Sequence, residues 1–241
     1  MPDLHYEDPQ LAELYDLDSG WSADRDFYLA LAGSDPIHIL DLGCGTGLLC
    51  DAYAARGHAV TGVDPAAAML EVGRGKPNGQ RVHWVQASAQ TFRSDDRFDL
   101  IVMTGHAFQT LLDDVDVVAT FATMREHLVR GGRIVFESRN PAIDWPARWN
   151  GDLVLEVGGA PVHEARRFMS MAGNRMSFEL RYTFPNRKLV SKSELLFLSR
   201  EEIEGWLGAS GLSTETVMGD WNGQPFDPRT SPEMIFVGRH A

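Results

Sequence analysis

The sequence predicts an α/β fold: a mainly parallel, seven-stranded sheet with helices on both faces and a small antiparallel β insertion. Three observations favour this fold. Five apolar segments of strand length alternate with segments of helical spacing over residues 36–138, which is typical of a parallel sheet. Two further strands are expected near residues 213–219 and 233–239. Before them, residues 141–198 contain consecutive strand-like segments, which indicates an antiparallel sheet inserted after the fifth strand.

The first half of the chain contains residues that typically begin and end helices. Gly57 follows an apolar helical pattern and is a typical C-cap residue. Pro65 stands at the first position of the next expected helix, where its missing N–H costs nothing. Together with the apolar segments, these residues predict strands over 36–42, 58–64, 81–87, 97–105 and 131–138, and helices over 47–57, 65–75 and 113–130.

The second half begins with strand-like segments separated by turn residues, such as the pair Gly173-Asn174. Ser199 and Glu202 then form a predicted capping box, which begins a helix that ends at Gly211. We therefore predict a main domain formed by residues 1–140 and 199–241, with residues 1–34 as a helical lid and residues 141–198 as the inserted antiparallel subdomain.

Charge and cysteine content argue against several classes of function. The 241 residues carry a net charge of −12 and no Lys/Arg cluster longer than two residues, so no nucleic-acid partner is expected. Cys44 and Cys50 are six residues apart, which matches neither a disulfide framework nor a zinc site. No secretory signal and no membrane-spanning segment is visible, so we expect a cytoplasmic protein with no membrane contact and no metal.

The segment LDLGCGTG, residues 40–47, follows the first expected strand and has the form of a ligand-binding loop. Its G-x-G-x-G spacing differs from the G-x-G-x-x-G of dinucleotide-binding loops, and it lacks the Gly-Lys-Ser/Thr ending of a P-loop. Asp41 stands directly before the loop, where its charge repels a pyrophosphate and attracts an ammonium or sulfonium group. Asp64 ends the second strand and can accept hydrogen bonds from both ribose hydroxyls. The loop therefore predicts a nucleoside ligand with a cationic tail.

Four segments resemble motifs of one known family, the class I S-adenosylmethionine (SAM)-dependent methyltransferases. ILDLGCGTG is similar to the first motif and VTGVDPAAAML to the second, while FDLIVMTGHAFQTL and LVRGGRIVFESRNP are similar to the fourth-strand and fifth-strand segments. The resemblance covers residues 35–140 strongly and the last strands more weakly. It implies a Rossmann-like fold, SAM as the cofactor and methyl transfer as the reaction.

The resemblance also implies where SAM would bind. Asp41 and the loop glycines would surround its methionine part, and Asp64 would hold the ribose. Ser88 stands where the family usually has an aspartate, so its hydroxyl and the N–H of Ala89 would contact the adenine. The N-terminal aromatic residues either pack against the sheet or close over the ligand. The predicted cofactor-binding residues are Tyr15, Trp21, Asp41, Gly43, Cys44, Gly45, Asp64, Pro65, Met69, Ser88, Ala89, Thr104 and Gly105.

The ends of the fourth and fifth strands carry the candidates for acceptor chemistry, since ligands of such sheets lie beyond the carboxyl ends of the strands. His106 is the predicted catalytic base, and a structural role beside the SAM tail is the alternative. Glu137 and Arg139 either bind a polar acceptor or pair with each other and nearby helices. The loop tryptophans either form an aromatic mouth or hold the inserted sheet in place. The predicted substrate-binding residues are Gln109, Glu137, Arg139, Asn140, Trp145 and Trp221.

The inserted sheet carries both charged and apolar side chains. We expect the charged residues, including Arg166 and Arg167, on a solvated face. The apolar residues, including Val154, Leu155, Phe168 and Met169, either cover the main domain or pair with a second copy of the sheet. The second arrangement would form a homodimer.

Absent signatures narrow the acceptor. No Asn/Asp-Pro-Pro-aromatic element follows the fourth strand and no Pro-Cys pair occurs, so methylation of nucleobase amides or of cytosine carbon is not expected. The sequence therefore predicts methyl transfer from SAM to N or O of a small-molecule acceptor. The alternatives are a methyltransferase acting on a protein or RNA, a SAM-binding protein without turnover and, as a weaker alternative, a dehydrogenase.

Overall fold

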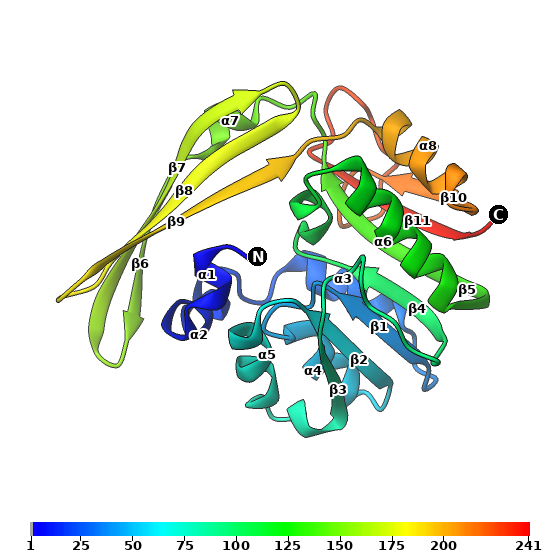
Figure 1. The fold of residues 1–241 in the computed structure, drawn as a ribbon, viewed down its shortest axis with the longest axis horizontal. Helices are drawn as coiled ribbons and strands as arrows, with labels where there is room; N and C mark the ends of the chain where they lie inside the picture. Colours follow the sequence, from blue (N-terminus) through cyan, green and yellow to red (C-terminus); the bar gives the residue numbers. More distant parts are fainter. Residues whose placement is uncertain (1) are drawn as a thin grey trace.

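A computed structural model describes residues 2–241, and its strands form two separate sheets (Figure 1). The strands of the larger, main sheet are β1 (His38–Leu42), β2 (Ala59–Asp64), β3 (Val82–Gln86), β4 (Phe98–Met103), β5 (Leu128–Arg139), β10 (Leu212–Met218) and β11 (Glu233–His240). They lie in the order β10-β11-β5-β4-β1-β2-β3. β11 is antiparallel to β5 and β10, and all other neighbours are parallel. The predicted mainly parallel, Rossmann-like sheet is confirmed.

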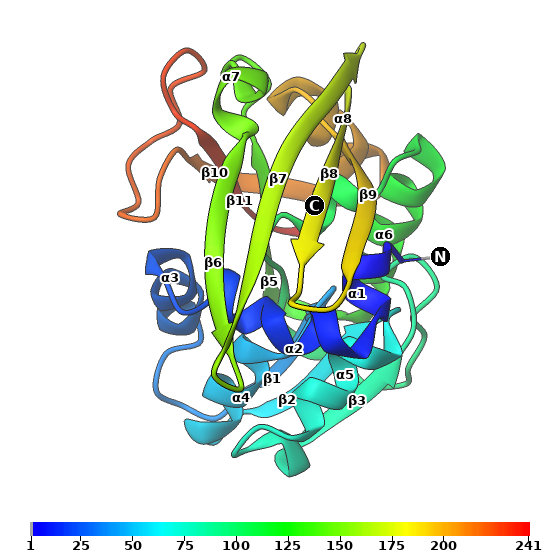
Figure 2. The ribbon, with the colours of Figure 1, turned by 90° about the vertical axis from the view of Figure 1, so that its left-hand side faces the viewer.

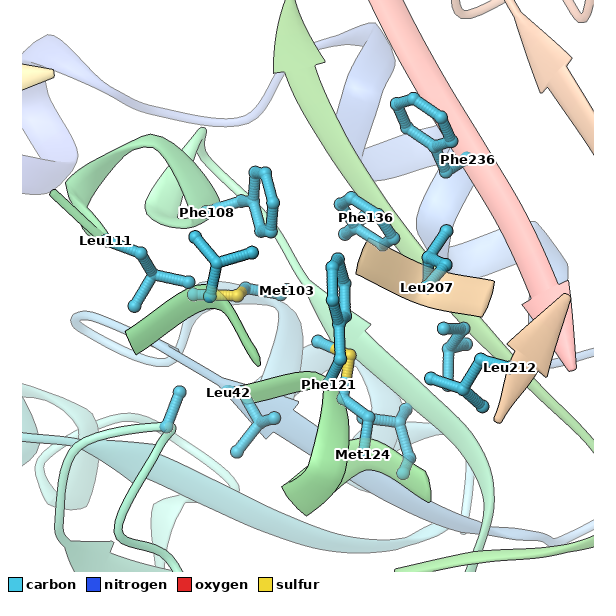
Figure 3. Close-up of a cluster of buried hydrophobic side chains, with 14 of the residues drawn as sticks. Leu42, Met103, Phe108, Leu111, Phe121, Met124, Phe136, Leu207, Leu212 and Phe236 are labelled. Atoms are coloured by element: carbon cyan, nitrogen blue, oxygen red, sulfur yellow. The ribbon is translucent and has the colours of Figure 1, made fainter. Parts of the chain in front are cut away.

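Helices cover both faces of this sheet, as predicted. α3 (Ala23–Leu31) and α4 (Leu48–Ala55) pack on one face, and α6 (Asp114–His127) and α8 (Arg200–Ala209) pack on the other. Successive side chains of β4 point to opposite faces of the sheet and so contribute to both cores. Val102 packs on the first face and Met103 on the second. Figure 3 shows the second core, where Phe121 of α6, Phe136 of β5 and Leu207 of α8 lie together.

Two segments depart from the predicted boundaries. The expected helix over 113–130 ends at His127, because Leu128 pairs with Phe98 of β4 and so begins β5. The tryptophan-containing segment expected as a loop contains a short helix, α7 (Trp145–Trp149). Asp144 begins this helix by accepting a hydrogen bond from the N–H of Ala147 at 3.2 Å.

The inserted residues form a four-stranded sheet that stands over the carboxyl ends of the main sheet (Figure 2). Its strands are β6 (Gly151–Val157), β7 (Ala160–Ala172), β8 (Arg175–Thr183) and β9 (Lys188–Leu196), all antiparallel to their neighbours. Leu155 is buried on its inner face, and Phe168 packs against the same apolar cluster. The antiparallel insertion is confirmed, whereas the exact division into domains stays a prediction.

The N-terminal helices α1 (Leu4–Glu7) and α2 (Pro9–Asp18) lie between the small sheet and α5 (Ala67–Arg74) (Figure 1). Leu14 of α2 packs in the apolar cluster of the small sheet, and Ala12 packs against Met69 of α5. The backbone N–H and the ring Nδ1 of His5 lie 3.1 and 2.9 Å from the hydroxyl of Ser191 on β9. These contacts join α1 and α2 to the small sheet and to helix α5 of the main domain. Within residues 2–241, no helix is long and apolar enough to cross a membrane.

Candidate functional site

Two adjoining cavities lie between the main sheet and the small sheet. The larger cavity, about 970 Å³, opens at the carboxyl ends of β1 to β4, and the smaller cavity, about 460 Å³, lies beside it under β7 and β8. Both volumes are in the range of small-molecule sites. The residues that line both cavities, and so form their common wall, are Tyr6, Tyr15, Gly105, Thr110 and Phe178.

Most predicted cofactor-binding residues line the larger cavity. Trp21 lines only the smaller cavity, and Asp41, Cys44 and Met69 line neither. Met69 is fully buried in the contact between α5 and α2, so it supports the N-terminal helices. The predicted residues at the larger cavity are Tyr15, Gly43, Gly45, Asp64, Pro65, Ser88, Ala89, Thr104 and Gly105.

The glycine loop needs glycine for two different reasons. Gly45 has a φ of +54°, and a Cβ there would meet no atom within 4 Å, so the backbone itself borders the larger cavity. Gly47 has a φ of +68°, and its Cβ would lie only 2.2 Å from the ring of Trp84. The loop is therefore shaped by backbone conformation at Gly45 and by close packing at Gly47.

Asp64 joins the end of β2 to the glycine loop. One of its carboxylate oxygens accepts the N–H of Gly45 at 2.9 Å, and the other accepts the N–H of Ala66 at 2.8 Å. Burial nevertheless raises the pKa of Asp64 above its usual value. A carboxylate has about four acceptor positions, so two remain for hydroxyl groups of a ligand in the larger cavity.

Asp41 is a buried carboxylate with an unfilled acceptor. It is 1% exposed, and its Oδ2 lies 3.5 Å from the thiol of Cys50. Its Oδ1 has no hydrogen-bond partner among residues 2–241. Burial raises the pKa of Asp41 to about 7. A cationic group nearby would stabilise the ionised form, which fits the predicted ammonium or sulfonium neighbour.

The N-terminal helices are tied to the glycine loop through Asp16. The hydroxyl of Thr46 donates to Asp16 at 2.5 Å, and Lys76 forms an ion pair with the same carboxylate. Tyr15, the preceding residue, lines both cavities, and its ring centroid lies 6.0 Å from that of Tyr6. This supports the predicted position of the N-terminal aromatics over the ligand, although Tyr28 of α3 lies in the core beneath the sheet.

His106 lies at the rim of the smaller cavity in a constrained conformation. Its φ of +61° makes it the only residue other than glycine with a positive φ among residues 2–241. Its N–H donates to Glu137 at 2.6 Å, and its Nε2 lies 2.9 Å from Oε2 of Glu233. Carboxylates therefore hold both the backbone and the ring of His106, as expected for an oriented histidine.

Several predicted substrate-binding residues are occupied by contacts inside the protein. Glu137 is 1% exposed and accepts the hydroxyl of Tyr28 in addition to the N–H of His106. The amide of Asn140 donates to the carbonyls of Pro228 and Ser231 at 3.0 and 2.9 Å. The residues from this prediction that line neither cavity are Gln109, Glu137, Asn140, Trp145 and Trp221. Their buried contacts indicate supporting roles.

Arg139 does line the smaller cavity and belongs to a stacked arrangement of cations and rings. Its guanidinium lies 5.1 Å from the ring centre of Trp149 and donates to the side chain of Gln109 at 3.0 Å. Arg166 of β7 lies over the same Trp149 ring at 5.1 Å and donates to the carbonyl of that residue. Burial lowers the pKa of Arg139. Arg166 is exposed, as expected for a charged residue of the small sheet, and its side chain also borders the smaller cavity.

Further residues of the small sheet line the smaller cavity and were not predicted from the sequence. Among them are Glu164, Phe178 and Tyr182. The alternation of β7 contains a signal for Glu164, since it shares a face with the buried Val162. Its position under α2 could not be inferred, because that contact joins segments about 150 residues apart in sequence.

Comparisons with known proteins agree with these features. Residues 39–132 match the family described as "Methyltransferase domain". A ubiquinone biosynthesis O-methyltransferase of Saccharophagus degradans is 31% identical over 135 residues, which are 54% of this chain and only 56% of that protein. A cypemycin N-terminal methyltransferase of a Streptomyces species is 25% identical over 98% of both chains. The solved structure of SAM-bound CalS10, an amino pentose methyltransferase of Micromonospora echinaspora, has a TM-score of 0.72 at 25% identity and covers 96% of this chain and 97% of that one.

Proposed function

We infer that this chain belongs to the class I SAM-dependent methyltransferases, and we propose that it transfers a methyl group from SAM to N or O of a small-molecule acceptor. The observation that carries the proposal is the pair of cavities with a common wall at Tyr15 and Gly105. One cavity lies at the glycine loop and the other lies beside it under the small sheet. Two ligands bound there would therefore meet at this wall.

The larger cavity suits SAM. Asp64 has acceptor positions left for the ribose hydroxyls. Asp41 lines neither cavity, but its buried carboxylate lies at the start of the glycine loop and would attract a positively charged methionine part. Ser88 and Ala89 line the same cavity and would contact the adenine. SAM supplies a methyl group on a sulfonium, which is already activated for transfer.

The protein's contribution is then to align the acceptor and exclude water. Arg139 and Trp149 would orient the acceptor in the smaller cavity, and the ring of His106 is positioned at its rim to accept a proton. The α1–α2 segment covers the common wall, because Tyr6 and Tyr15 line both cavities. A cavity of this size favours a small acceptor over a folded protein or RNA.

The proposal is tested by binding and by turnover. Titration calorimetry should show that the protein binds SAM and S-adenosylhomocysteine but not NAD. Incubation with SAM and a panel of small amines, phenols and alcohols should release S-adenosylhomocysteine together with a product 14 mass units heavier. A protein that binds SAM and methylates none of the panel, but methylates proteins or RNA in an extract, would refute the small-molecule assignment.

Three finer predictions belong to the same proposal. The protein is located in the cytoplasm, has no nucleic-acid partner and forms a homodimer through the small sheet. Leu155 and Phe168 face the inner cluster and are not available to a second copy. Val154 remains exposed, so a dimer would use it, whereas Met169 lines the larger cavity. Light scattering of the wild type and of Val154→Glu tests this interface, since a monomeric wild type would exclude it.

A further inference from the structure

Glu164 is a buried carboxylate that the proposed mechanism has not used. It lies on β7, lines the smaller cavity and is only 8% exposed. Its side chain makes no hydrogen bond or ion pair within residues 2–241. Burial and the charge of Asp18 raise its pKa, and the charge of Arg166 lowers it. Because Glu164 lines the cavity and has no partner in the described chain, a cationic group of a ligand bound there would stabilise its carboxylate.

The neighbours of Glu164 leave it free to receive a ligand. Its cross-strand partner on β8 is Tyr182, and Asp18 of α2 is the other acidic group at this end of the cavity. Arg166, two residues further along β7, is turned to Trp149, where its Nε donates to the backbone carbonyl at 2.8 Å. Glu164 and Asp18 therefore place two carboxylates at this end of the cavity, and the Nε of the neighbouring cation, Arg166, is engaged by a backbone carbonyl.

We propose that Glu164, in place of His106, takes the proton of the acceptor. Glu164 binds the amino group of the acceptor, so that the acceptor is a primary or secondary amine. This inference rests on the proposed function. The proton of the bound ammonium moves to a carboxylate oxygen of Glu164. The lone pair freed on nitrogen forms the new N–C bond while the S–C bond of SAM breaks and its electron pair stays on sulfur. The products are the methylated ammonium and S-adenosylhomocysteine.

Burial favours this proton transfer for an amine. An ammonium and a carboxylate become two neutral groups, which relieves the cost of burying both charges. When a phenol gives its proton to Glu164, the negative charge moves from the carboxylate to the phenolate and is not removed. This phenolate would face Asp18. Burial and Asp18 raise the pKa of Glu164 to about 7, which suits a base that works near neutral pH.

The first test compares two probes of the same shape, benzylamine and benzyl alcohol, on the protein loaded with S-adenosylhomocysteine. Trp149, Phe178 and Tyr182 line the cavity and suit the benzyl ring. In calorimetry at pH 7.5, the wild type should bind benzylamine at least about tenfold more tightly than the alcohol. Glu164→Gln should lose this preference. Glu156→Gln, an exposed residue on the neighbouring strand β6, should keep it.

The second test follows the pH profile of benzylamine methylation. The wild-type rate should rise through about pH 7, as Glu164 loses its proton among Asp18, Arg166 and Tyr182. Glu164→Gln should be slower by about 100-fold or more and should lack this rise. Its rate should increase only above about pH 9, where free amine forms in water.

The outcomes separate this inference from the proposed function. Glu164→Gln should have the melting temperature and the S-adenosylhomocysteine affinity of the wild type. If it also keeps the preference for amines and the pH profile of the wild type, the role of Glu164 is overturned. A wild type that binds both probes equally, binds neither, or methylates only the alcohol would overturn it as well. A wild type that does not bind S-adenosylhomocysteine would instead refute the proposed function.

Discussion

The N–H of His106 donates a hydrogen bond to the carboxylate of Glu137 across 2.6 Å, and this contact holds the only positive-φ residue other than glycine among residues 2–241. The hydroxyl of Tyr28 donates to the second oxygen of the same carboxylate. Glu137 thus links α3, the end of β5 and the loop after β4. The orientation of the His106 ring at the smaller cavity therefore depends on a residue that lines neither cavity.

His106→Asn tests the ring of His106 without changing the backbone. Asparagine tolerates a positive φ better than most residues, so the loop should keep its conformation. Methyl transfer should fall by about 100-fold if this ring takes the proton of the acceptor, and by less than about threefold if Glu164 takes it. The affinity for SAM should stay within about threefold of the wild type. Rates from S-adenosylhomocysteine release and affinities from calorimetry give the comparison, and an unchanged rate would leave His106 with a structural role.

Asp64→Ala should weaken SAM binding by at least about tenfold, because a buried acceptor of hydroxyl groups is lost. The same change leaves the N–H groups of Gly45 and Ala66 without acceptors and should lower the free energy of unfolding by about 1–3 kcal/mol. The matched control is Asp95→Ala, since Asp95 is exposed and lines neither cavity. Calorimetry at a temperature where both variants are folded separates the two effects. Wild-type affinity in Asp64→Ala would exclude the ribose contact.

Asp41 should make the ligand-free protein less stable as the pH rises. Burial raises its pKa from the ordinary 3.8 to about 7, so the folded state holds a proton that the unfolded state has lost. The stability from this group is complete below about pH 4 and disappears as the pH rises through 7. Asp41→Asn has no proton to lose. Urea unfolding at several pH values should show a shallower decline between pH 4 and 7 in Asp41→Asn than in the wild type, and equal declines would contradict this.

The same group should release a proton when SAM binds. A cationic ligand beside Asp41 favours its ionised form, so protonated Asp41 must lose its proton on binding below pH 7. Calorimetry at pH 6.5 in two buffers of different ionisation enthalpy should detect this proton for the wild type and a smaller release for Asp41→Asn. If both proteins release the same number of protons, the positive charge of the ligand does not lie beside Asp41.

The sequence was sufficient for the main sheet because each strand is marked locally. The segment containing Ile39 and Leu40 is apolar on both faces, and Asp41 and Asp64 stand near the ends of their strands, as predicted. The start of β5 was missed because Leu128 continues a helical apolar pattern. Only its pairing with Phe98, a contact between separate segments, turns it into a strand residue.

The acceptor side was harder to predict because it depends on contacts between distant segments. Alternation predicts that Glu137 and Arg139 share a face. In the structure, Glu137 accepts the hydroxyl of Tyr28 from α3, and only Arg139 lines a cavity. Likewise, Glu164 is a charged residue on a strand, which by itself is typical of a solvated face. Helix α2 lies over Glu164, whereas Arg166, two residues further along β7, stays exposed. No local pattern in either segment specifies the contact with α2.

Gly47→Ala and Gly45→Ala should affect different properties. A methyl group at Gly47 would collide with Trp84, whose ring also packs against Gly62 and Gly73, and would strain a positive φ. We expect a loss of about 2–4 kcal/mol in the free energy of unfolding. Gly45→Ala meets no protein atom within 4 Å, so it should cost only about 1–2 kcal/mol but weaken SAM binding at least tenfold. Equal stability losses with equal SAM affinities would show that the loop adapts around Trp84.

Arg139→Met should separate stability from acceptor binding. Arg139 is a half-buried cation that makes no ion pair within residues 2–241, and burial lowers its pKa, so its charge is costly to the fold. Methionine keeps much of the volume and removes the charge, so the free energy of unfolding should rise or change by less than about 1 kcal/mol. The KM for the acceptor should rise by at least about tenfold if the guanidinium contacts it. Arg148→Met, at an exposed position of α7, is the control and should change neither quantity. A destabilised Arg139→Met with an unchanged KM would instead show that the cation serves the packing of Trp149.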